Sequence, residues 1–170
     1  MVEMARAGRP FMMNIQTNEV TKHRMDLYRK TMRESGYDDA AVARNVENCW
    51  VWRNIFVAET DAEAEKLALP AFKTQSEFRM AMRKKVYEEQ GLMLKQENAA
   101  APAARNETSH AVICGSPATV AEEIAKIDAI GVGGLILTFR IGPMPYDATA
   151  NSIELFMKKV APAFKAKKAA

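Results

Sequence analysis

Residues 112–140, with the sequence VICGSPATVAEEIAKIDAIGVGGLILTFR, carry the clearest structural pattern in the chain. Ser116 is a favoured helix N-cap, and Pro117 suits the first helical position, where its missing N–H costs nothing. Apolar residues then recur at helical spacing, opposite a charged face; they are Val120, Ile124, Ile127 and Ile130. Gly131 ends this predicted helix, and residues 134–140 (GLILTFR) follow as a predicted strand buried on both faces.

Two further strands and several helices are predicted elsewhere. Residues 48–59 (NCWVWRNIFVAE) are rich in aromatic and β-branched residues and form the strongest predicted strand. Residues 10–16 (PFMMNIQ) form a shorter one. Amphipathic helices are predicted at 21–35, at 38–46, from Thr60 to a break or kink at Pro70, at 75–90, and near the C-terminus. Strands that alternate with helices in this way indicate an α/β fold with a parallel sheet.

The apolar positions of three helices predict which side faces the core. Each helix repeats such residues at steps of three or four. These residues are Met25, Tyr28 and Met32 in the first helix, Phe78, Met82, Val86 and Tyr87 in the helix at 75–90, and Ile153, Phe156, Val160 and Phe164 in the last. Residues 1–9 have helix-forming composition and end at Gly8, so we expect the chain to open on the last turn of a helix.

Composition and charge exclude several classes of function. The chain has 170 residues, with 24 Lys and Arg against 21 Asp and Glu, so its net charge is +3. Near-balance argues against a nucleic-acid surface, and no apolar run is long enough to span a membrane. Cys49 and Cys114 lack the spacing of a disulfide framework or zinc site, and we expect buried, inert thiols. His23 and His110 are too few for a histidine metal centre. We expect a cytoplasmic protein.

Residues 60–63 (TDAE) follow the strongest predicted strand and allow two interpretations. They match a capping box, in which the Thr60 hydroxyl accepts from the Glu63 N–H and the Glu63 carboxylate reaches back to the Thr60 N–H. Alternatively, Thr60 and Asp61 are catalytic, because they lie at a strand-to-helix turn. The spacing favours the structural interpretation.

A stretch at 96–110 (QENAAAPAARNETSH) has no apolar period and is predicted to be a mobile loop or lid. His110 closes it, and an ordinary solvated histidine is favoured there over a catalytic one.

Four segments together resemble the bacterial-luciferase-like flavin monooxygenases. They are GSPATVAEEI (115–124), GVGGLIL (131–137), SIELFMKKVAP (152–162) and VAETDAEA (57–64). The C-terminal part of that family carries a G-[ST]-P-x-x-V-A-E helix, a G-V-D-x-hydrophobic strand and a helix ending in V-x-P. Gly133 departs from the pattern, because the family usually has Asp at that position. These are mostly scaffold motifs, so they indicate a fold more specifically than a substrate.

The resemblance implies a (β/α)₈ TIM-type barrel. Such a barrel needs roughly 250 residues and eight strands, whereas the sequence of this chain predicts three strands. We therefore expect a partial barrel over residues 1–170, made of the last βα units. The family's chemistry is oxygenation of a small organic substrate by O₂ and reduced FMN or a related deazaflavin. The earlier strands, which carry most of the flavin site in that family, are missing from this stretch.

Residues at the carboxyl ends of the strands are the candidates for a site. Arg140 is the first choice, because a guanidinium beside a Gly-Pro loop suits an anion of flavin or substrate; a pair with Asp147 is the alternative. Gln16 is the second, as an amide that bonds a flavin ring edge or caps a loop.

Two functions therefore remain open at the level of sequence. The chain is either the C-terminal portion of a flavin-dependent monooxygenase, not active alone, or a dimerising partial-barrel module that does not bind flavin. Both predict association, as a homo-oligomer or with a chain that supplies the missing half of the barrel, because open sheet edges recruit partners.

Overall fold

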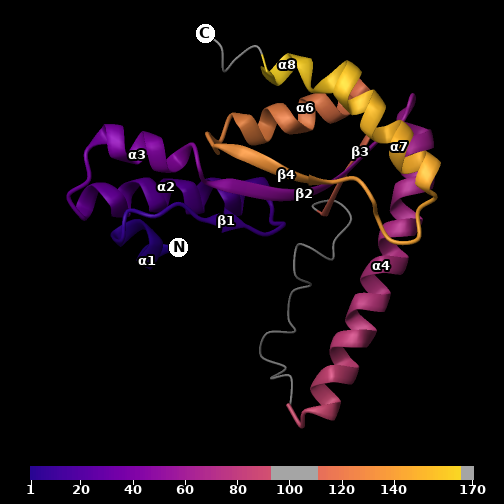
Figure 1. Cartoon of the computed structure of the whole chain (residues 1–170), viewed down its shortest axis with the longest axis horizontal. Helices are drawn as coiled ribbons and strands as arrows, with labels where there is room; N and C mark the ends of the chain where they lie inside the picture. The colour runs from indigo at the N-terminus through magenta and orange to yellow at the C-terminus, as the bar shows by residue number, and fades with distance from the viewer. Residues whose placement is uncertain (93–110, 166–170) are drawn as a thin grey trace.

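The computed structural model of the protein describes residues 1–92 and 111–165 (Figure 1). The predicted loop at 96–110 lies outside the described residues. In chain order the elements are α1 (Val2–Arg6), β1 (Met12–Met13), α2 (Asn18–Glu34), α3 (Asp39–Val46), β2 (Trp50–Val57), α4 (Asp61–Glu89), β3 (Val112–Gly115), α6 (Pro117–Asp128), β4 (Gly134–Thr138), α7 (Tyr146–Leu155), the π-helical turn η3 (Phe156–Val160) and α8 (Pro162–Lys165). The predicted α/β class with parallel strands is confirmed.

Strand β2 is the centre of the sheet and pairs in parallel with all three other strands. β1 pairs with Trp50 and Val51, β4 pairs from Trp50 to Asn54, and β3 pairs from Asn54 to Val57. Trp50 and Val51 pair with both β1 and β4, and Asn54 pairs with both β3 and β4. A strand residue has one partner on each edge of its strand, so β4 lies on one edge of β2, and β1 and β3 lie one after the other on the opposite edge. In a closed barrel consecutive strands are neighbours, whereas here β3 and β4 both border β2.

The predicted strands at 48–59 and 134–140 contain β2 and β4. The strand expected at 10–16 is much shorter, because only Met12 and Met13 pair with β2 before the chain turns into α2. β3 was not predicted, since four residues (VICG) give too short an apolar run to show a period.

The two faces of β2 pack against different helices. Val51 contacts a cluster that includes the predicted Met25, Tyr28 and Met32 of α2, all fully buried. Further along the same face, Ile55 and Val57 pack against α6 and η3. Val51, Ile55 and Val57 are separated by even numbers of residues, as expected for one face of a strand. Phe56, on the other face, packs against Ala64, Ala68 and Phe72 of α4.

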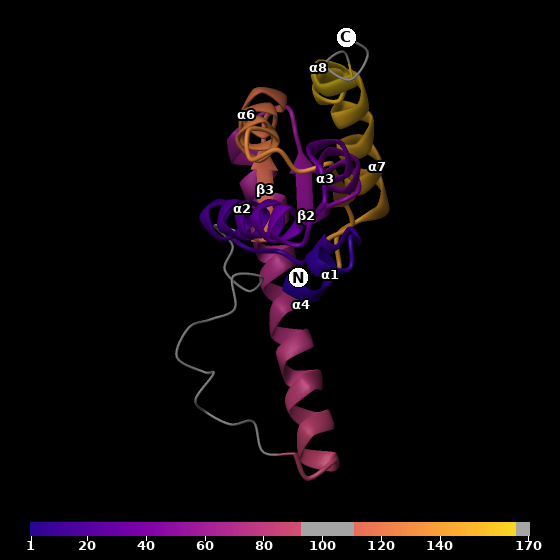
Figure 2. The same cartoon turned by 90° about the vertical axis from the view of Figure 1, so that its left-hand side faces the viewer.

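Helix α4 is continuous from Asp61 to Glu89, where the sequence predicted two helical segments separated at Pro70. The buried positions Ala64, Ala68 and Phe72 continue across the proline, so packing holds the helix together despite the lost hydrogen bond. Its second half leaves the body of the molecule (Figures 1 and 2). Phe78 is 65% exposed, and Met82 and Val86 are also exposed, so the core face predicted for 75–90 is wrong.

The last predicted helix is interrupted by η3, and this shifts which residues face inward. Phe156 and Val160 are buried as predicted, but Ile153 is exposed and Ser152 is buried in its place. A π-helical turn adds one residue to the helical repeat, so a fixed 3.6-residue stripe does not extend across it. The Ser152 hydroxyl accepts a hydrogen bond (2.7 Å) from the N–H of Val57, which lies beyond Asn54, the last β2 residue paired with β4.

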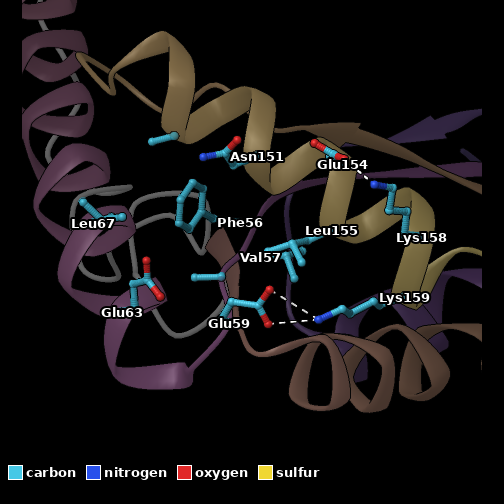
Figure 3. A pocket seen from close by; sticks show the side chains of 12 residues that line it. Phe56, Val57, Glu59, Glu63, Leu67, Asn151, Glu154, Leu155, Lys158 and Lys159 are labelled. Atoms are coloured by element: carbon cyan, nitrogen blue, oxygen red, sulfur yellow. Dashed lines mark hydrogen bonds and ion pairs between the residues drawn. The ribbon is translucent and has the colours of Figure 1, made fainter.

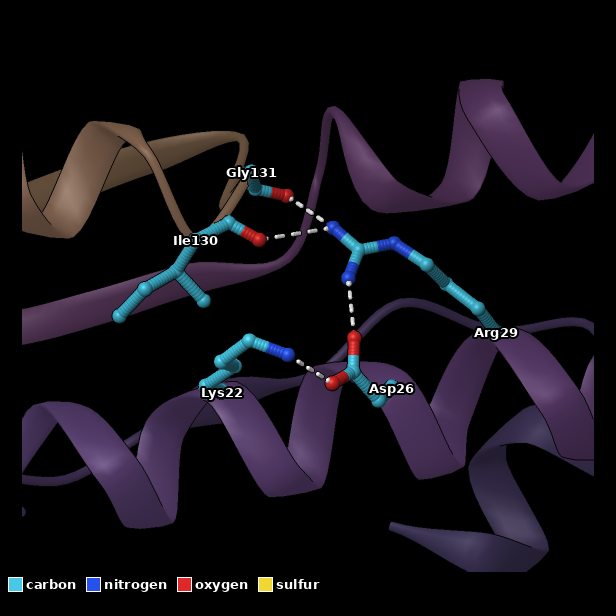
Figure 4. A network of polar contacts seen from close by, with 5 residues as sticks. All are labelled: Lys22, Asp26, Arg29, Ile130 and Gly131. Carbon is cyan, nitrogen blue, oxygen red and sulfur yellow. Dashed lines mark hydrogen bonds and ion pairs between the residues drawn. The ribbon is translucent and has the colours of Figure 1, made fainter.

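Arg29 of α2 ties that helix to the end of α6 (Figure 4). Its Nη2 donates to the carbonyls of Ile130 (3.1 Å) and Gly131 (2.6 Å), and its Nη1 bonds Asp26. Carbonyls at a helix C-terminus lack partners within the helix and favour a cation. The contact therefore closes α6 and fixes its position against α2.

Replacement of Arg29 by Met should lower the free energy of unfolding by about 1.5–3 kcal/mol, because charged hydrogen bonds to two backbone carbonyls are lost. Urea denaturation followed by circular dichroism measures this. The control is Arg33→Met, which removes only an exposed ion pair with Asp39 and should cost less than about 1 kcal/mol. Equal losses in the two variants would contradict the assigned role of Arg29.

Gly133 lies where α3 passes the start of β4. Its N–H donates to the Cys49 carbonyl (2.9 Å), and a Cβ at this position would lie 2.0 Å from the carbonyl oxygen of Glu47. The aspartate usual in the resembled family therefore does not fit this packing.

Gly133→Ala should destabilise the fold by about 3 kcal/mol or more, because the Cβ forces two backbone segments apart. Gly36→Ala is the matched control. Gly36 has a positive φ of 91° but open space around it, so only the backbone strain of about 1–2 kcal/mol applies. The midpoints of thermal unfolding compare the two, and a Gly133 variant no less stable than the Gly36 variant would refute the clash.

Candidate functional site

The carboxyl end of β2 opens into a cavity of about 600 Å³ (Figure 3). Side chains of functional sites gather at this end of parallel strands. The end of β2, the first turns of α4, and α7 with η3 form its walls; the lining residues are Phe56, Val57, Ala58, Glu59, Glu63, Leu67, Ala148, Asn151, Glu154, Leu155, Lys158 and Lys159.

Charged side chains surround the mouth of this cavity. Lys159 Nζ donates to both carboxylate oxygens of Glu59, at 2.9 and 3.3 Å, and Lys158 is hydrogen-bonded to Glu154. The bond from Lys158 lowers the pKa of Glu154. The Glu63 carboxylate makes no hydrogen bond or ion pair within the described ranges. Both ion pairs are largely exposed, so they contribute little stability and exchange partners readily.

Apolar side chains also line the cavity, among them Phe56, Leu67 and Leu155, which lie beside the charged groups (Figure 3). An apolar interior with a few polar groups is typical of sites for small organic molecules. The cavity thus suits a molecule with an apolar body and a charged or polar end. Among these residues, Glu59 is the last residue of the strand predicted at 48–59, so only its place at a carboxyl strand end could have indicated a site. Lys158 and Lys159 follow it by about a hundred residues, and no local pattern joins them to it.

Thr60 caps α4, as the capping-box interpretation predicted, and Asp61 makes a contact with α6 that the interpretation did not include. Thr60 Oγ1 accepts from the Glu63 N–H at 3.2 Å, which is one of the two expected bonds. Asp61 Oδ1 accepts a 2.6 Å bond from the Ser116 N–H at the start of α6. This bond, with the side chains of Thr119 and Ser116, lowers the pKa of Asp61. The carboxylate therefore occupies the N-terminus of α6 and links α4 to it.

Arg140 and Gln16, the two predicted flavin ligands, lie apart. Arg140 follows β4, and its exposed guanidinium makes no hydrogen bond or ion pair with any described residue, Asp147 included. Gln16 follows β1 on the opposite edge of β2 and lines a separate cavity of about 270 Å³. Neither residue lines the cavity at the end of β2. Their roles as flavin ligands stay predictions.

The remaining candidates are accounted for as follows. Cys49 is buried and Cys114 partly buried, and burial raises the pKa of both thiols, that of Cys114 to about 11. Within 1–92 and 111–165, no cluster of three His, Cys, Asp or Glu could hold a metal ion. No helix in those ranges is long and apolar enough to cross a membrane. His110 lies outside the described residues.

The fold and the cavity at the strand ends define a part of an α/β barrel, and comparison with known proteins identifies the family. The profile of luciferase-like monooxygenases matches residues 1–133. The chain therefore belongs to the luciferase-like monooxygenase family. No curated protein is similar enough in sequence to count as a relative.

Solved structures show the same fold in longer proteins. A monooxygenase from Streptomyces bottropensis is 21% identical, with a TM-score of 0.65, over 96% of this chain and 44% of that one. The oxygenating constituent of 3,6-diketocamphane monooxygenase from a Pseudomonas putida plasmid, solved with FMN, is 22% identical (TM-score 0.60; 95% and 44%). The coenzyme F420-dependent tetrahydromethanopterin reductase from Methanopyrus kandleri is 18% identical (TM-score 0.59; 96% and 49%). This chain thus spans less than half of each.

Asp61→Asn should destabilise the protein in a pH-dependent way. A lowered folded-state pKa means that the carboxylate stabilises the fold above its ordinary pKa of 3.8, and that this contribution is lost as the pH falls through the folded-state value. The difference in melting temperature between wild type and variant should have its largest value at pH 7 and should decrease below about pH 4. Asp147→Asn, which removes another first-turn carboxylate, is the control. A pH-independent difference would contradict the link to Ser116.

Proposed function

We propose that this chain is the C-terminal portion of a flavin-dependent monooxygenase, which uses reduced flavin and O₂ to oxygenate a small organic substrate, and that it is not active alone. The family membership supports the reaction class. Two of the structures that share the fold, by their descriptions, bind FMN or depend on coenzyme F420. Bound flavin would supply the reaction with O₂, and this chain would supply one wall of the substrate pocket.

The arrangement of the described residues carries the second half of the proposal. Arg140 and Gln16 lie beyond strands on opposite edges of β2, and no shared cavity joins them. In the described part of the chain, Arg140 and Gln16 therefore do not form one flavin site between them. A complete site requires strands that border β4 on its outer edge, supplied by a second copy or by a chain with the rest of the barrel.

The alternative is a dimerising module that does not bind flavin. The exposed apolar residues on the protruding half of α4, Phe78, Met82 and Val86, favour association of some kind. Association alone does not separate the two functions, because both require it.

Titration with FMN and with a deazaflavin separates them. We expect weak binding that perturbs the visible spectrum, and at least a tenfold loss of affinity in Arg140→Ala, because a charge-assisted contact is removed. Arg44→Ala, an exposed arginine on α3, is the control and should leave binding unchanged. The isolated chain should oxygenate no test substrate faster than free reduced flavin does. Absence of binding up to about millimolar FMN would favour the module.

A further inference from the structure

A second large cavity lies between α6, β4 and α8. It measures about 690 Å³, and α6 and α8 lie on the same side of β4 (Figure 1). The described residues that line it are Ile124, Asp128, Val132, Gly133, Gly134, Leu135, Leu137, Phe156, Ala161 and Phe164. It shares no lining residue with the cavity at the end of β2, so the two are separate sites.

The lining of this cavity is apolar almost throughout. Apart from Asp128, each lining residue is apolar or a glycine, so the walls offer almost no side-chain hydrogen bonds to a polar ligand. Phe156 and Phe164 are among the wall residues, and phenyl rings favour an aromatic neighbour. Leu135, Leu137 and Phe164 are only partly buried, so a ligand in the cavity can reach them. An aromatic molecule without charge matches such a surface.

The back of the cavity is part of the protein core. Ile124, Phe156 and Ala161 are buried members of the cluster that joins α6 and η3 to β2. Packed core side chains keep their positions, so the cavity exists before a ligand binds. A preformed site loses little affinity to the ordering of the protein around the ligand.

Asp128 is the charged side chain among the described residues that line the cavity. It is exposed, so it lies at the solvent side of the site. Its carboxylate disfavours an anionic ligand, because like charges repel and the apolar walls do not compensate a lost hydration shell. Fatty acids and other organic acids are therefore poor occupants, whereas a neutral molecule is not affected.

The size of the cavity favours a small molecule over a helix of another protein. A helix with its side chains is about 10 Å across and rises about 5.4 Å per turn, so two turns occupy roughly 850 Å³. This exceeds the 690 Å³ of the cavity. Cavities of about 300–1,000 Å³ with mostly apolar walls are those in which proteins bind small organic molecules.

We propose that the cavity between α6, β4 and α8 binds a small neutral aromatic molecule. The buried apolar area of the ligand supplies its affinity, and the carboxylate of Asp128 excludes acids of the same shape. The proposal does not rest on the proposed flavin function, because the site uses none of the residues assigned to it.

Titration of the whole chain with naphthalene-2-carboxamide, followed by ligand-observed NMR, tests the proposal. We expect saturable binding with a Kd of about 0.1–1 mM, because apolar burial is the main gain. Naphthalene-2-carboxylate has the same shape but a negative charge and should bind at least about tenfold more weakly. Asp128→Asn should strengthen binding of the carboxylate about threefold and leave that of the carboxamide unchanged. Glu122→Gln, an exposed residue of α6 outside the cavity, should change neither.

Phe164→Ala provides a second test that does not depend on charge. Phe164 is partly exposed and lies in α8, the last described helix, so the rest of the chain should stay folded, which circular dichroism checks. The variant lacks one aromatic wall and should bind the carboxamide about fivefold more weakly or worse. Phe78→Ala, which truncates an exposed phenylalanine of α4 outside the cavity, should leave binding unchanged.

Several results would overturn the site. They are no saturable binding up to about 2 mM carboxamide, equal binding of the carboxylate, and equal losses in the two phenylalanine variants. Sedimentation velocity detects a second copy of the chain as the occupant: if Phe164→Ala dissociates an oligomer and Phe78→Ala does not, the cavity is a contact between chains and the proposal fails. Displacement of the carboxamide by FMN would also overturn it, whereas an FMN titration without binding would count against the proposed function alone.

Discussion

The pairing of every other strand with β2 is the constraint on which the structure depends. Its eight residues pair with strands along both edges of β2, and their alternating side chains contribute to both faces of the sheet. Val51, Ile55 and Val57 point to the side of α2, α6 and η3, whereas Phe56 points to α4. The helices therefore take their positions from one strand, and a change in its register would exchange the two cores.

Polar contacts at helix ends then fix the βα units to one another. Asp61, at the start of α4, accepts from the N–H of Ser116, the N-cap of α6, and Arg29 of α2 donates to two carbonyls just beyond the end of that helix. Both contacts need close approach: a Cβ on Gly115 would lie 2.8 Å from Asp61 Oδ1, and one on Gly131 would lie 2.7 Å from Arg29 Nη2. Neighbouring units are thus joined by groups that a helix leaves unsatisfied at its ends.

Local signals predicted most of the fold, and long-range ones were missed. Ser116 and Pro117 placed the start of α6, because capping depends on adjacent residues. The inward position of Ser152 depends on a π-helical turn, which no residue pattern announces. Arg53 sits inside a strand of aromatic and β-branched residues, and its burial follows from α2 and α6, not from its neighbours in sequence. The Glu59–Lys159 pair spans 100 residues and could not be predicted from either segment.

The cavity that Gln16 lines and the cavity at the end of β2 follow from the same incomplete sheet. Between Val51, the last β2 residue paired with β1, and Asn54, the first paired with β3, no described strand pairs with this edge of β2. The Arg53 guanidinium donates there to the Trp52 carbonyl, which a neighbouring strand would otherwise bond. At the opposite edge β4 stops at Asn54, and Ser152 satisfies the N–H of Val57. Side chains thus supply the hydrogen bonds that these backbone groups would receive from a neighbouring strand in a complete sheet. A closed barrel leaves no such edges. Added strands would therefore pair first beside β4, on the side of β2 opposite the cavity that Gln16 and Arg53 line between α2 and α6.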